Sequence, residues 1–245
     1  MATMKTAKAR ALTSTAKSAA PAADEKQRET STFVAYSRIK QLILDNELAP
    51  GAQVLEQTLA DQLGLSRTPV RDALTRLSQE GLLEVVPRHG IRVLPMSPDD
   101  MREIYEVLIA LEPAATEMLT LRRPSKEEIA PLIEACEAME QALEDDDLPR
   151  WATADARFHS SLIGLCGNRR LATMVSGVWE QSHRARMFTL RLRAKPVQST
   201  REHREIVEAI LAGDAAKARD LYRSHRETAA KGMMKLIEDF GLNRL

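Results

Sequence analysis

The chain has 245 residues and a formal net charge of zero, because 35 Lys and Arg balance 35 Asp and Glu. It is 44% hydrophobic and 29% charged, no apolar run approaches the length of a membrane span, and its two cysteines, Cys136 and Cys166, lack a CxxC spacing. These features exclude a membrane-spanning protein and a disulfide scaffold, and they predict a soluble, cytoplasmic chain of two domains with a tail.

The tail is the first stretch of the chain. Residues 1–31 are rich in Ala, Thr, Ser and Lys, and Met1–Ala23 contains four basic residues and no acidic one. The segment lacks the long apolar core of a secretory signal. We therefore expect a disordered N-terminal arm that serves as a flexible extension, with contact to nucleic-acid phosphates as the alternative.

Residues 32–95 have the pattern of three helices. The first helix is predicted over roughly Phe33–Glu47, and a short second helix ends at Gly64, which suits a left-handed cap. Ser66 then stands at an N-cap position, with Pro69 in the first turn of the third helix. The apolar side of the third helix comprises Val70, Ala73, Leu74 and Leu77.

Basic and hydroxyl side chains occupy the other side of the third helix. Arg67 and Arg71 are four residues apart and share a face, with Thr68 beside them. A helix that presents such residues at its start can enter the major groove of DNA.

A hairpin is predicted after the third helix. Two apolar runs, Leu82–Val86 and Ile91–Leu94, flank a tight turn that contains Arg88, His89 and Gly90. A basic turn at the tip of a hairpin suits contact with phosphates or with the minor groove.

Three motifs in this region resemble the winged helix-turn-helix of the GntR family of bacterial transcription regulators. They are Leu48–Gly51, Leu63–Arg71 and Glu80–Leu83. The resemblance implies a recognition helix that carries Arg67, Thr68, Pro69 and Arg71, and a wing tip formed by Arg88, His89 and Gly90. Gln57 departs from the pattern, since some members have a DNA-contacting Arg there.

The charges of this region nevertheless balance. The segment Phe33–Pro95 contains seven Lys and Arg residues and seven Asp and Glu residues. We therefore expect modest, salt-sensitive affinity for DNA that depends on a local basic surface and on a homodimer bound to a two-fold symmetric operator.

Residues 98–241 are predicted to form a second domain, an antiparallel all-α bundle of six helices joined by short connections. The fold class is thus mainly α, with a winged helix-turn-helix followed by the bundle. The predicted helices are Pro98–Leu121, Ser125–Asp146, Pro149–Leu165, Arg169–Leu192, Pro196–Ala212 and Asp214–Phe240.

Four residues of this bundle have the chemistry of metal ligands. Asp155 and His159 are four residues apart on one helix, and His203 and His225 fall on the apolar sides of two others. Three imidazoles and a carboxylate that converge suit Zn²⁺, or Mn²⁺, Ni²⁺ or Fe²⁺ with added waters. For each histidine alone, a hydrogen-bonded core residue is the alternative.

The bundle resembles the FCD ligand-binding domain of one large GntR subfamily, on the segments around Asp155–His159, Glu202–Asp214 and Ala218–His225. The resemblance implies that Asp155, His159, His203 and His225 hold a divalent metal beneath a small carboxylate effector. The family commonly has an Arg where this chain has Leu108, so the effector class is less constrained. Substitute contacts are expected from Arg102, Arg157, Arg184, Arg186 and His183.

These inferences predict a ligand-responsive regulator, and they favour a repressor that a small carboxylate or sugar acid releases from operator DNA. A metal-dependent hydrolytic enzyme and a metalloregulator that senses the metal itself are the alternatives.

Overall fold

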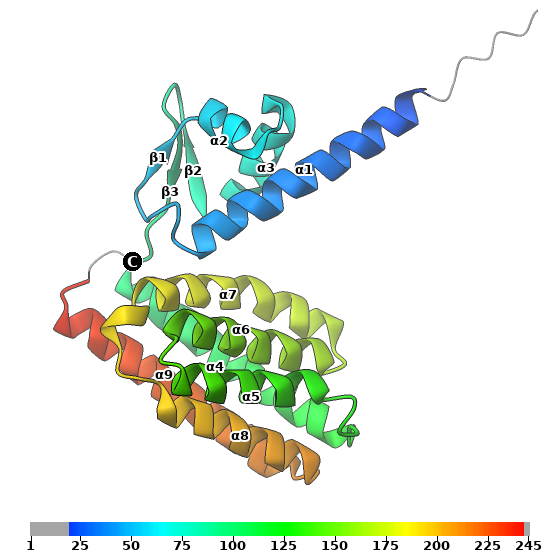
Figure 1. Cartoon of the computed structure of the whole chain (residues 1–245), viewed down its shortest axis with the longest axis vertical. Helices are drawn as coiled ribbons and strands as arrows, with labels where there is room; N and C mark the ends of the chain where they lie inside the picture. The colour runs from blue at the N-terminus through cyan, green and yellow to red at the C-terminus, as the bar shows by residue number, and fades with distance from the viewer. Residues whose placement is uncertain (1–19, 243–245) are drawn as a thin grey trace, which may run out of the picture.

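A computed structural model describes residues 20–242 of the chain (Figure 1). Two separate hydrophobic clusters divide these residues into an amino-terminal domain, drawn in blue to green at the top of Figure 1, and a helical domain below it. Among the described residues, no helix combines the length and apolarity that a membrane span requires.

The amino-terminal domain has three helices and three short strands. Its elements are α1 (Ala20–Leu44), β1 (Gln53–Val54), α2 (Glu56–Leu63), α3 (Arg67–Gln79), β2 (Leu83–Val86) and β3 (Gly90–Val93). Helix α1 begins well before the predicted start at Phe33 and includes residues 20–31, so a disordered arm through residue 31 is wrong for that part. Residues 1–19 of the predicted arm lie outside the described residues.

The predicted hairpin is confirmed, and a third strand joins it. The strand order is β1-β3-β2, with both pairs antiparallel and Val54 opposite Ile91. The two-residue strand β1 gave no sequence signal because alternation needs a longer run. Gly90 has a φ of 84°, and a Cβ there would collide with the Val54 carbonyl oxygen. The glycine therefore permits the close pairing of β3 with β1.

Helix α3 packs against α1 through the predicted apolar side. Val70, Ala73, Leu74 and Leu77 are all buried. Gly64 ends α2 in the left-handed conformation, as predicted. Ser66 has the extended backbone of an N-cap, but its hydroxyl makes no capping hydrogen bond. The start of α3 therefore lacks a side-chain cap, while its buried apolar side packs against α1.

The helical domain contains the six predicted helices and a short 3-10 helix, η1. Their bounds are α4 (Pro98–Leu121), α5 (Ala130–Glu144), α6 (Leu148–Leu165), α7 (Arg169–Phe188), η1 (Leu190–Leu192), α8 (Val197–Leu211) and α9 (Ala215–Asp239). Helix α5 starts later than predicted, and the chain leaves α7 at Phe188 instead of continuing to Leu192.

Helix α4 is the centre of the bundle. It begins with a capping box in which Ser97 and Asp100 satisfy each other's backbone N–H groups. It packs against α9, α7, α6 and α8, and α7 in turn contacts α1 of the amino-terminal domain. Helix α7 therefore lies between the interior of the bundle and the other domain, as Figure 1 shows.

Candidate metal centre and nucleic-acid interface

The start of α3 presents two exposed arginines. The side chains of Arg67 and Arg71 are 58% and 61% exposed, and the Glu56 carboxylate lies 3.7 Å and 3.1 Å from them. Together with Arg88 of the hairpin, they line a hollow between α2, α3 and the β2–β3 turn. Basic groups from two elements thus share one surface, which suits a polyanion, and Glu56 reduces the positive charge at its edge.

The other predicted residues of this surface differ in exposure. Thr68, Arg88 and His89 are exposed, as DNA contact would require. Pro69 is buried in the core of the domain, so it cannot touch DNA and that prediction is wrong. Gln57 donates to Asp61 at 2.7 Å on α2.

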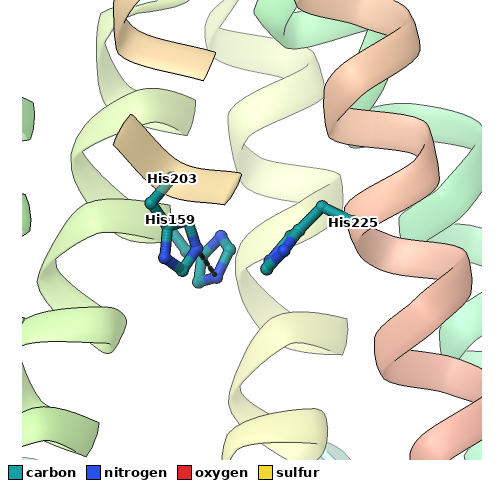
Figure 2. Close-up of side chains that lie close together, drawn as sticks. All are labelled: His159, His203 and His225. Atoms are coloured by element: carbon teal, nitrogen blue, oxygen red, sulfur yellow. Dashed lines mark hydrogen bonds between the residues drawn. The ribbon is translucent and has the colours of Figure 1, made fainter. Parts of the chain in front are cut away.

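Three histidines from three helices meet in the interior of the helical domain. His159 of α6, His203 of α8 and His225 of α9 place ligand atoms within 4.8 Å of one another, and all three are buried. Figure 2 shows the imidazoles turned toward a common point, with the Nε2 atoms of His159 and His203 3.3 Å apart. The structure therefore brings together the three histidines that the sequence analysis selected as metal ligands.

Asp155 completes one side of the cluster. Its Oδ1 lies 3.5 Å from His159 Nε2 and 3.8 Å from His203 Nε2. Its Oδ2 accepts a hydrogen bond from Arg186, so one oxygen faces the histidines and the other holds α7. The carboxylate is 1% exposed.

The protonation states suit a cation. Burial lowers the pKa of His159 well below its usual value, and the neighbouring Arg226 guanidinium lowers it further. Burial, with the adjacent His225 imidazole, does the same to His203. Burial alone would raise the pKa of Asp155, but Arg186 and the two histidines hold it well below its usual range. Neutral imidazoles beside an ionised carboxylate are the forms that bind metal.

Outer partners orient two of the three imidazoles, those of His159 and His225. His225 Nδ1 lies 2.7 Å from Glu202 Oε2, and this hydrogen bond lowers the pKa of Glu202. His159 Nδ1 lies 2.7 Å from the Tyr222 hydroxyl. A carboxylate that accepts the Nδ1–H of an imidazole leaves its Nε2 for a metal, as Glu202 does for His225. The donors, their burial and their outer partners therefore fit a divalent cation such as zinc.

A buried ion pair supports this arrangement from α4. Arg226 of α9 donates to Glu112 through two nitrogens, and its NH2 group lies 2.9 Å from Glu112 Oε1. The same nitrogen lies 3.1 Å from His159 Nδ1. Sequence reasoning missed Arg226, although its place directly after His225 could have signalled it.

A cavity of about 600 Å³ opens onto the cluster. Asp155, His159 and His225 form part of its wall, and Arg186 and Arg193 supply cationic groups. Most of the remaining wall is apolar, including Trp151, Leu190, Met233 and Leu236. A small acid could therefore approach His159 and His225 from the cavity.

The predicted effector contacts are only partly in this cavity. Arg186 lines it. Arg102 pairs with Asp99 and Arg157 with Glu134 on the outside of the domain, so predicting them as contacts was wrong. His183 stacks on Trp179, with ring centroids 5.1 Å apart, and does not line the cavity. Helical spacing predicted which domain contains these residues but not whether their side chains lie on the surface or line the cavity.

Comparisons with known proteins agree with the two-domain division. Residues 33–93 match the family described as bacterial regulatory proteins, gntR family, and residues 103–228 match the FCD domain. The chain is 48% identical over 131 residues to an uncharacterised HTH-type transcriptional regulator from the TAR-I ttuE-ttuC' intergenic region of Agrobacterium vitis, covering 53% of this chain and 77% of the relative.

Two further proteins extend the similarity. The chain is 27% identical over 202 residues to the HTH-type transcriptional repressor GlaR of Escherichia coli, covering 78% of this chain and 90% of the relative. Its fold is similar to that of Escherichia coli McbR/YncC, with a TM-score of 0.75 and 23% identity over 86% of this chain and 98% of the other.

Proposed function

This chain belongs to the GntR family of transcription regulators and carries an FCD domain, and we propose that it is a repressor released from operator DNA by a small carboxylic acid. The observation that carries the proposal is the cavity lined by Asp155, Arg186 and two members of the buried histidine cluster, His159 and His225. The matched families and relatives are DNA-binding regulators rather than enzymes, so the cavity is better explained as a sensor than as an active site. Such a protein acts on DNA in the cytoplasm.

The proposed metal ligands are Asp155, His159, His203 and His225. Zinc is our first choice because three imidazoles and one carboxylate suit it, while Mn²⁺, Ni²⁺ and Fe²⁺ remain candidates that need added waters. When bound, the metal supplies a Lewis-acidic position that a carboxylate or sugar acid can reach from the cavity. Arg186 provides a charge-assisted hydrogen bond beside it.

The proposed DNA contacts are the exposed residues at the start of α3 and at the wing. Arg67, Thr68 and Arg71 would read base edges in the major groove, and Arg88 and His89 would contact the backbone or the minor groove. Gly90 would contribute only the shape of the turn. One such domain reads few base pairs, so we propose a homodimer on a symmetric operator.

An apolar stripe on α4 supports the homodimer. Val107, Met118 and Leu121 lie on one face of the helix, and their exposed fractions are 39%, 38% and 68%. A two-fold symmetric contact between two copies would cover this stripe on both. It would also place the two amino-terminal domains at a fixed separation.

We propose that α7 couples the cavity to the DNA surface. Its Arg186 pairs with Asp155 on one side, and its Glu180 pairs with Lys40 of α1 at 2.7 Å on the other. Lys40 also donates to Glu80, the C-cap residue of α3, at 2.9 Å. A ligand carboxylate that takes Arg186 from Asp155 would shift α7 and, through Lys40, the end of α3. The acid must bind the two arrangements with different affinity for this to act.

The test is thermal unfolding of the full-length protein with zinc, and again after chelation, across small carboxylic and sugar acids. A ligand that binds only the folded state raises the melting temperature. We expect at least one acid to do so with zinc and not after chelation, and to release a genomic fragment selected by the protein. If zinc alone releases the fragment, the protein senses the metal; if no acid acts, the proposal fails.

A further inference from the structure

We propose that the effector carries two anionic groups and that Arg193 binds the one farther from the histidines, so that the ligand is a dicarboxylic acid. This inference rests on the proposed function and specifies the ligand class of the same cavity. It starts from a difference among the three arginines that line the cavity wall.

Two of these arginines already have carboxylate partners. Arg226 pairs with Glu112 and Arg186 pairs with Asp155. Arg193, which follows η1, has no ion pair among the described residues. Its Nε and NH2 groups instead donate to the Thr189 hydroxyl, at 3.2 Å and 2.8 Å.

Arg193 is therefore oriented but not neutralised. The Thr189 hydroxyl in turn donates to the Ala185 carbonyl oxygen, which fixes the guanidinium against the end of α7. The contact with Met233 sulfur, 3.7 Å from NH2, adds no charge. Burial lowers the pKa of Arg193 to about 10, which leaves the side chain cationic at neutral pH.

The surroundings favour an anion from the ligand rather than from the protein. The cavity wall near Arg193 includes Leu192, Met233 and Leu236, which cannot balance its charge. Asp239 also lines the cavity, but it is exposed and pairs with Lys235 at 3.0 Å. Arg193 is half-buried, and a half-buried cation without an ion-pair partner is unfavourable, so an incoming carboxylate would relieve that cost.

The two cationic positions belong to one ligand site. Arg193 lines the same cavity as Arg186, Asp155, His159 and His225, and it is close enough to interact electrostatically with both Arg186 and Asp155. A ligand with one carboxylate beside Arg186 would leave Arg193 unpaired. A ligand with a second carboxylate would satisfy both positions.

The test compares acids that differ by one charge at nearly constant size. Zinc-loaded full-length protein is titrated calorimetrically with malonate, succinate, glutarate and adipate, and with the monoamide of each. Because a hydrogen bond to a charged group is worth roughly 10- to 100-fold in affinity, at least one diacid should bind at least about tenfold tighter than its monoamide.

The variant Arg193→Gln should remove that preference. We expect its diacid affinity to fall to that of the monoamide, with zinc content unchanged. Arg191→Gln is the matched control, because Arg191 is exposed and does not line the cavity.

The outcomes separate the two proposals. If diacids and monoamides bind equally, or if Arg193→Gln keeps the preference, the assignment of Arg193 is wrong while carboxylate sensing stands. If no acid binds the zinc-loaded protein, both proposals are overturned.

Discussion

Arginine occupies two contrasting environments in the two domains. At the start of α3, the side chains of Arg67 and Arg71 are 58% and 61% exposed. In the helical domain, those of Arg226 and Arg186 are 1% and 11% exposed, and each pairs with a buried carboxylate. An exposed charge can exchange its partner for a phosphate at little cost in folding. A buried one leaves its partner's charge unbalanced unless another charged group replaces it.

The contrast gives a rule for variants of this protein. Changes at the amino-terminal surface should alter DNA affinity and leave the fold and metal content alone. Changes in the interior of the helical domain should alter metal binding, stability or ligand response and leave the DNA surface intact.

The largest expected effect comes from removing a metal ligand. The variant His203→Ala should lose zinc and the stabilisation by acids, because removing a ligand should exceed the 10- to 100-fold loss typical of an outer partner. Zinc content by mass spectrometry and thermal unfolding with acids measure both. DNA binding should persist, which shows that the variant folds; unchanged zinc content would remove His203 from the site.

Breaking the buried ion pair should produce the next largest effect. Arg226→Met leaves Glu112 buried without a partner and should reduce the free energy of unfolding by about 3–5 kcal/mol. Urea unfolding measures the change. The double variant with Glu112→Gln should recover part of the loss, since no unpaired carboxylate then remains. A loss within experimental error in the single variant would contradict the interior environment inferred for this pair.

The pH dependence of the stability of the chelated protein tests whether the histidine cluster is held neutral in the interior of the helical domain. The pKa values of His159 and His203 lie well below 6.5 in the folded chain, so the unfolded state binds more protons as the pH falls below about 6.5. Stability should be fully present above that pH and should fall below it, by up to about 1.4 kcal/mol per pH unit for each histidine.

Urea unfolding from about pH 7.5 to about pH 5 measures this slope. His89→Gln, at an exposed position on the hairpin, should keep the same curve. A flat curve for the chelated wild-type protein would mean that the cluster is not held neutral by burial.

A substitution at the amino-terminal surface should change DNA affinity, whereas the substitutions in the helical domain should change zinc content or stability. Arg71→Ala should weaken operator binding by about 1–3 kcal/mol and leave zinc content and stability unchanged. Fluorescence anisotropy at fixed salt measures the affinity. Arg157→Ala is the control, because this exposed arginine pairs with Glu134 in the other domain. Operator affinity equal to that of the wild type would refute the placement of Arg71 at the DNA surface.

The sequence predicted the helices and the inward direction of the three histidines because both depend on local periodicity. The apolar sides of α3 and of the helices bearing His159, His203 and His225 fixed which side chains face inward. Pro69 was misassigned because a family motif gives the position of a residue and not its burial. The two-residue strand β1 was missed since its pairing with β3 is a long-range contact.

The cavity was harder to predict than the cluster. Arg193 follows η1, just beyond the end of the predicted helix Arg169–Leu192, so its direction could not follow from helical spacing. Arg102 and Arg157 were chosen for charge alone, but each finds an acidic neighbour on the surface. Which arginine faces a cavity depends on the packing of several helices, and one helix does not determine that.

The smallest predicted effect would test whether the two environments are connected. Glu180→Gln removes the ion pair with Lys40 but not the pairing of Lys40 with Glu80. Because the change touches neither the cavity wall nor the DNA surface, it should lower the acid-induced change in operator affinity by about 0.5–2 kcal/mol while zinc content stays the same. Glu140→Gln, which breaks the exposed pair with Arg204 inside the helical domain, is the matched control. If operator affinity shifts equally with and without acid, the Lys40–Glu180 pair only holds the domains together. If only the ratio of the operator affinity without acid to that with acid changes, α7 transmits the state of the cavity to α1. The exposed and buried arginines are then parts of one switch.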